Sequence, residues 1–136
     1  MTCCSEGGGH MAQEKNFENK IKDFLKQNKC WFIKYWGGGF YTKDGTPDIL
    51  CCCKGRFIAI EVKAPDGKPT LIQCQKLKQI NDAGGYAILL YPEQWHCFEN
   101  FIWCIRCGDF RNADLNYEGI LQPVWIEWLR KLKGQD

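Results

Sequence analysis

The segment Gly-Thr-Pro-Asp-Ile-Leu-Cys-Cys-Cys-Lys-Gly-Arg-Phe-Ile-Ala-Ile-Glu-Val-Lys, residues 45–63, decides the fold because it contains two strand-like runs joined by a short turn. Side chains of a strand point alternately to its two faces. One face of the second run, residues 57–63, is wholly apolar, as expected for a strand that lies on a core. This face consists of Ile58, Ile60 and Val62. The other face becomes charged only at its last two positions, Glu61 and Lys63, which are therefore candidates for a functional site.

The turn at Lys54-Gly55 predicts that the two runs are antiparallel. Asp48, the first residue of the first run, is then expected beside Glu61 at one end of the hairpin. We interpret Asp48 and Glu61, with the backbone carbonyl of Val62, as ligands of Mg²⁺ or Mn²⁺, which prefer hard oxygen donors. Lys63 would stabilise transition-state charge or position the attacking water in phosphodiester hydrolysis. The alternative is an ordinary Pro-Asp turn and a solvated Glu/Lys pair, since short motifs are common.

The residues around these positions resemble the PD-(D/E)xK nuclease superfamily. The resemblance rests on residues 45–48 (Gly-Thr-Pro-Asp), 61–63 (Glu-Val-Lys), the Pro-Asp-Gly-Lys loop at 65–68 and Ile72-Gln73, and it covers about residues 14–92. The most similar group is the small phage-type VRR-NUC branch, which is similar to archaeal Holliday junction resolvases. The resemblance implies a restriction-endonuclease-like core, dependence on Mg²⁺ or Mn²⁺, and a homodimer that acts on branched DNA.

The same resemblance implies two further site residues, Glu18 on the first helix and Gln73 on the helix after the motif. Glu18 borders the buried stripe of its helix and therefore turns partly inward, although it could instead pair with Lys22 at i+4. Glu14, one turn earlier, is the substitute. Gln73 also fits a capping box that begins at Thr70, in which its side chain would bind the backbone of its own helix. The two roles of Gln73 are compatible.

Candidate DNA contacts gather near the site although the net charge is only +2, because local clustering sets the field that a phosphate experiences. Most lysines of the chain are expected to solvate helix surfaces. The loop from Trp36 to Tyr41 holds three large aromatic residues around three glycines, and it would either stack on bases or pack at a subunit interface. The predicted DNA contacts are Lys34, Trp36, Tyr41, Lys43 and Lys68.

Composition predicts an intracellular chain, possibly phage-encoded, without a membrane span or a secretion signal, because no long apolar run exists. Residues 1–10 are expected to be an added leader, and residues 11–136 a single nuclease domain with a core at about 14–92 and a helical extension at about 93–136. The ten cysteines are expected to be reduced thiols. Cys104 and Cys107 form a CxxC pair, but a zinc site would need a distant recruit such as Cys97 or His96.

The fold class predicted from these patterns is α/β, with a mixed central sheet flanked by helices. A strand near 86–91 follows a helix that Thr70 caps and Gly84-Gly85 end, so this crossover should pair it in parallel with the Glu61 strand. The other expected elements are a helix at 12–28, a strand at 30–36, a segment at 92–105 that begins as helix, and an amphipathic helix at 121–133 whose apolar side carries Val124, Trp125, Trp128, Leu129 and Leu132.

The function predicted from this sequence is that of a metal-dependent DNA endonuclease, structure-selective and homodimeric because cutting two strands needs two sites. Two alternatives remain open at this point. One is a nuclease of duplex DNA, either nonspecific or with a sequence preference. The other is a non-catalytic nucleic-acid-binding module that retains the nuclease fold.

Overall fold

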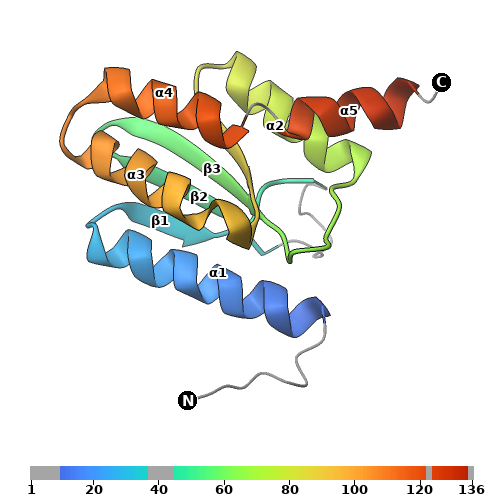
Figure 1. Cartoon of the computed structure of the whole chain (residues 1–136), viewed down its shortest axis with the longest axis horizontal. Coiled ribbons are helices and arrows are strands. Elements are labelled where there is room, and N and C mark those ends of the chain that lie inside the picture. Colours follow the sequence, from blue (N-terminus) through green and yellow to red (C-terminus); the bar gives the residue numbers. More distant parts are fainter. Residues whose placement is uncertain (1–9, 37–44, 122–123, 135–136) are drawn as a thin grey trace.

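A computed structural model describes residues 10–36, 45–121 and 124–134 of the chain (Figure 1). The chain order agrees with the predicted α/β pattern, and one helix, α4, was not predicted. The elements are α1 (His10–Gln27), β1 (Trp31–Lys34), β2 (Ile49–Cys53), β3 (Arg56–Val62), α2 (Leu71–Asp82), β4 (Tyr86–Leu90), the short 3-10 helix η1 (Pro92–Gln94), α3 (Trp95–Arg106), α4 (Phe110–Leu121) and α5 (Val124–Gly134).

The four strands form one mixed sheet in the order β1-β2-β3-β4. The β2–β3 hairpin turns at Lys54 and Gly55, whose φ angles of 52° and 80° are those of the type I′ turn that suits the twist of a hairpin. The parallel pairing of β3 with β4 is confirmed, with Glu61 opposite Leu89. The mixed sheet flanked by helices is therefore confirmed, and the crossover helix α2 begins close to the end of β3 where the site residues lie.

The helices cover the sheet unevenly. From Ile58 to Lys63 every side chain of β3 and its continuation is buried, because both faces of this strand are covered. α1 and α3 lie next to each other, and the rings of Phe24 and Trp95 meet edge to face at 5.2 Å between centroids (Figure 1). α5 packs on α2 away from this pair. On β1, which is an edge strand of the sheet, Trp31 remains 66% exposed.

The C-terminal part differs from the prediction in two respects. The region predicted as one helix from residue 121 contains the end of α4 and then α5, and Leu132 of α5 is 39% exposed instead of lying on the buried side. α4 was missed because asparagines and a glycine, which are weak helix formers, interrupt its sequence. It is held by tertiary contacts instead: the hydroxyl of Tyr117 accepts a hydrogen bond from the Ala87 amide at 3.0 Å.

Among the residues that the structure describes, no helix is long and apolar enough to cross a membrane.

Candidate active site

Asp48 is fixed at the open end of the hairpin by backbone contacts on both sides. It lies just before β2, and its carbonyl oxygen accepts a hydrogen bond from the Tyr35 amide at 2.8 Å, which extends the β1–β2 pairing. Its Oδ2 accepts a hydrogen bond from the Val62 amide, also at 2.8 Å. A strand residue directs its N–H and C=O toward the same neighbour, so the Val62 carbonyl lies on the Asp48 side. Asp48 and the end of β3 are therefore held together, as predicted.

Gly45 allows the loop before Asp48 to dock on the first turn of α2. Its φ of 78° is in the left-handed region, and a Cβ atom here would overlap the Ile72 side chain and lie 2.9 Å from the Ile72 carbonyl oxygen. Only glycine fits both conditions without a shift. The Gly-Thr-Pro-Asp segment is thus seated against α2, which also carries Gln73.

Glu61 and Lys63 are buried close to each other at the end of β3. Glu61 is 2% exposed and Lys63 is 8% exposed, and Lys63 Nζ lies 3.6 Å from Glu61 Oε2. Burial, and then the charge of Asp48, raise the pKa of Glu61 to about 9 against the opposing effect of Lys63. A divalent cation held by these carboxylates would favour the ionised form of Glu61.

Gln73 connects these two residues and also caps its own helix. Its Nε2 donates to Glu61 Oε2 at 3.0 Å, and its Oε1 accepts from Lys63 Nζ at 3.1 Å. Thr70 completes the predicted capping box, because its amide donates to Gln73 Oε1 while its hydroxyl accepts from the Gln73 amide. The amide orientation follows from this set, since a flipped side chain would point its donors at the Lys63 ammonium. Gln73 therefore contacts both the site residues and the start of its own helix, the two places where the sequence predicted it.

Glu18 lies at the site, but a lysine separates it from Asp48. It is 5% exposed, and its Oε1 accepts a hydrogen bond from Lys34 Nζ at 2.8 Å. The same ammonium lies 3.5 Å from Asp48 Oδ1. Lys22 and Lys15 lie 3.3 Å and 3.7 Å from Glu18 Oε2, so the predicted i+4 pair is present as well.

The charges around Lys34 stabilise each other. Burial alone would raise the pKa of Glu18, but the hydrogen bond and the charge of Lys34 outweigh it and hold that pKa below its ordinary value. Burial likewise opposes the charged form of Lys34, and the two carboxylates, Glu18 and Asp48, raise the Lys34 pKa despite it. Lys34 is therefore a fixed cation inside the site, although the sequence suggested only a DNA contact for it.

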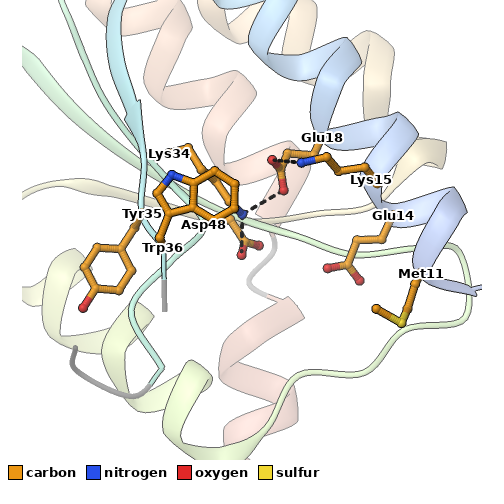
Figure 2. A pocket seen from close by; sticks show the side chains of 8 residues that line it. All are labelled: Met11, Glu14, Lys15, Glu18, Lys34, Tyr35, Trp36 and Asp48. Carbon is orange, nitrogen blue, oxygen red and sulfur yellow. Dashed lines mark hydrogen bonds and ion pairs between the residues drawn. The ribbon is translucent and has the colours of Figure 1, made fainter. Parts of the chain in front are cut away.

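An open cleft of about 290 Å³ gives access to this group of residues (Figure 2). α1 forms one wall, and the end of β1 with the segment before β2 forms the other. The carboxylate of Glu14 points into the cleft from α1, and its charge also acts on Glu61. The lining residues are Met11, Glu14, Lys15, Glu18, Lys34, Tyr35, Trp36 and Asp48.

The family of the chain follows from a comparison with known protein families. The family model described as archaeal Holliday junction resolvase (hjc) matches residues 10–89, more than half of the 136 residues. The chain belongs to this family. Membership confirms the resemblance to the PD-(D/E)xK nuclease superfamily and the restriction-endonuclease-like fold. No curated protein and no solved structure shows a significant match.

The match to the resolvase family covers α1 to β4, which supply all of the site residues described above. The helices α3 to α5 lie outside it. Its membership of the resolvase family supports nuclease activity and DNA binding for this chain. Which of its residues act on DNA has to be argued from the site.

The predicted DNA contacts of this resolvase-family chain lie in different places. Lys34 and Trp36 line the cleft. Lys68 is exposed on the loop after Lys63, beside a second hollow of about 360 Å³ that includes Trp128 of α5. The other two predicted contacts, Tyr41 and Lys43, lie outside the described residues.

The cysteines do not gather into a recognisable metal site in the described segments. No group of three or more histidine, cysteine or acidic residues there is arranged to hold an ion. Cys107 and Cys97 are exposed, and His96 pairs with Glu99 at 3.1 Å. On β2, Cys51 and Cys53 are buried and Cys52 is exposed, as strand alternation predicts.

Proposed function

We propose that this chain is a metal-dependent endonuclease that hydrolyses phosphodiester bonds in branched DNA. The observation that carries the proposal is the connected set of Asp48, Glu61, Lys63 and Gln73, of which Asp48 lines an open cleft. Membership of a nuclease family supports it. Assignment to the VRR-NUC branch, an intracellular location and a phage origin stay predictions.

The donor atoms at this place fit a hard divalent cation such as Mg²⁺ or Mn²⁺. The residues that would hold it are Asp48, Glu61 and the Val62 carbonyl, and all three offer oxygen. Only two of them are side chains, so the ion would also need backbone oxygen and water, as is usual for Mg²⁺. When bound, such an ion neutralises charge on the phosphoryl oxygens and lowers the pKa of a bound water.

The chain's own groups hold the reacting atoms and balance their charge. Lys63 supplies a buried ammonium for the negative charge that develops on the phosphoryl group. Gln73 keeps Lys63 and Glu61 in fixed positions through its two side-chain hydrogen bonds. Lys34 lies between the carboxylates of Glu18 and Asp48, so Glu18 acts by positioning Lys34. The cleft admits the DNA backbone, with Lys34 and Trp36 as contacts. Lys68, Tyr41 and Lys43 stay predicted DNA contacts.

The proposed function is tested by incubating the protein with a four-way junction, a linear duplex and single-stranded DNA of matched length. Each is assayed with Mg²⁺, Mn²⁺ or a chelator. We expect cleavage of the junction with either metal and none with the chelator. Equal cleavage of the duplex would favour the alternative of a duplex nuclease. Binding of the junction without cleavage under any condition would favour the non-catalytic module and overturn the proposal.

We also propose that the protein is a homodimer, and an exposed apolar surface on one face of β1, β2 and β3 supports this. Trp31 lies opposite Cys52, which lies opposite Phe57, so these three exposed residues form a row across three strands. Ile33 extends the row along β1. Large exposed apolar surfaces often mark interfaces, and a second copy would supply the second site that cutting two strands requires.

The dimer is tested with Trp31→Glu, which places a charge on this surface at its most exposed residue. We expect wild type to sediment as a dimer at micromolar concentration and the variant as a monomer that remains folded. Trp103→Glu is the matched control, because Trp103 on α3 is 64% exposed and lies outside the row. A monomeric wild type, or a dimer that Trp31→Glu leaves intact, would contradict this interface.

Gln73→Glu separates the catalytic role of Gln73 from its capping role. The new carboxylate can still accept from the Thr70 amide and from Lys63, but when ionised it cannot donate to Glu61, and it adds a further carboxylate beside Glu61 and Asp48. We expect a free energy of unfolding within about 1 kcal/mol of wild type and cleavage that is about 10- to 100-fold slower.

Thr70→Ala is the matched control for Gln73→Glu, since it removes the other half of the capping box and leaves the Gln73 side chain in place. It should cost about 1 kcal/mol of stability and leave the cleavage rate close to wild type. If Thr70→Ala slows cleavage as much as Gln73→Glu does, the cap alone accounts for the role of Gln73.

A further inference from the structure

Trp36 stands at the rim of the cleft with most of its indole exposed. Alternation along β1 places Phe32 and Lys34 on the side of α1, and Trp36 continues that series, whereas Trp31 and Ile33 point to the opposite side of the sheet. The Trp36 side chain is 68% exposed and lines the cleft. It is therefore neither part of the core nor part of the apolar row proposed for the dimer.

Two ammonium groups lie on the Glu18 side of the indole and connect it to the site. Lys34 Nζ lies 5.5 Å from the ring centroid and Lys15 Nζ lies 5.6 Å from it. The same Lys34 Nζ lies 3.5 Å from Asp48 Oδ1. The Lys34 ammonium is thus close to both the ring and the Asp48 carboxylate. DNA whose phosphate sits at Asp48 would bring a neighbouring base within reach of the indole face.

An exposed aromatic ring with cations on one side, close to a site proposed to bind phosphate, is the arrangement that single-stranded nucleic acid prefers, because bases stack on the ring while lysines hold the backbone. A base inside a continuous duplex already stacks on both of its neighbours. Only an unstacked base, at a branch point or a strand end, has a face free for the indole. The ring would therefore discriminate between DNA structures and not between base sequences.

We propose that Trp36 stacks on an unstacked base next to the phosphate at the site and so selects branched DNA over continuous duplex. This inference rests on the proposed function and deepens it. Trp36 acts as a specificity-determining residue, while Lys15 and Lys34 supply the charge that holds the adjoining backbone.

The test measures binding in chelator, where no cleavage occurs, for wild type, Trp36→Ala, Trp36→Phe and Trp103→Ala. The probes are a four-way junction with 2-aminopurine at the branch point and a linear duplex with the same fluorophore at its centre. We expect Trp36→Ala to weaken junction binding about 10-fold and duplex binding less than about 2-fold, with no change in the salt dependence because both lysines remain. Wild type and Trp36→Phe should quench 2-aminopurine in the junction, and Trp36→Ala should not.

Trp103→Ala controls for the loss of an exposed tryptophan and should match wild type with both probes. Equal losses of junction and duplex binding in Trp36→Ala, or unchanged junction binding and quenching, would overturn the stacking role. The proposed function can fail separately. If wild type quenches the junction probe but never cleaves with metal, the stacking role of Trp36 stands and the nuclease activity is refuted. If wild type cleaves junctions and Trp36→Ala keeps the full preference for junction over duplex, only the stacking role of Trp36 is refuted.

Discussion

Replacing Asp48 with asparagine is expected to slow cleavage of the preferred DNA by about 10³-fold or more. Asparagine keeps an oxygen that can accept the Val62 amide hydrogen bond, which is 2.8 Å long in the native protein. It loses the negative charge that a divalent cation requires, and this charge stabilisation is worth several kcal/mol in the transition state. Asp48→Ala should lose as much activity, and in addition it leaves the Val62 amide without its partner.

The measurement is a single-turnover cleavage rate with Mg²⁺, accompanied by thermal unfolding and by DNA binding in chelator. We expect Asp48→Asn to unfold close to wild type and to bind DNA at least as well, because a negative charge has been removed from the cleft. Asp82→Asn is the matched control: Asp82 is exposed and pairs only with Lys78 on the same helix, among the contacts described. Retention of more than a tenth of the activity in a folded Asp48→Asn protein would remove Asp48 from the site.

The hairpin that carries the site could be predicted because its determinants are local. The apolar alternation from Ile58 to Val62 and the turn at Lys54-Gly55 fix the pairing, and the pairing brings Asp48 to Glu61. The capping role of Gln73 was predictable for a similar reason, since a capping box fixes where a helix begins, whereas its place at the site was expected from the resemblance to the nuclease superfamily. Residues within a few positions of each other decide these features.

The position of Lys34 could not be predicted in the same way. The sequence places it on a strand near the site, but its contacts with Glu18 and Asp48 depend on how α1 packs across β1 and β3. The helix α4 was hidden for a related reason: its weak helix formers are compensated by contacts such as the one from Tyr117 to Ala87. Both features are set by tertiary packing and not by local pattern.

Replacing Lys63 with methionine is the change with the second largest expected effect. Methionine retains the length and the apolar stem of the side chain, which matters because Lys63 is only 8% exposed. It removes the ammonium that lies 3.1 Å from Gln73 Oε1 and 3.6 Å from Glu61 Oε2. Loss of one preorganised charge at a reacting phosphoryl group typically slows the chemical step by about 10²- to 10³-fold.

The comparison that isolates this charge is Lys78→Met, in which an exposed lysine with a surface ion pair to Asp82 is changed in the same way. That variant should cleave like wild type, because exposed ion pairs contribute about 0–1 kcal/mol and Lys78 lies on the outer face of α2. Single-turnover rates at saturating protein separate chemistry from binding, and Lys63→Met should lose rate with little change in DNA affinity. A Lys63→Met protein that loses affinity but keeps its saturated rate would make Lys63 a DNA-binding residue, since a charge that acts only in the transition state must change the rate.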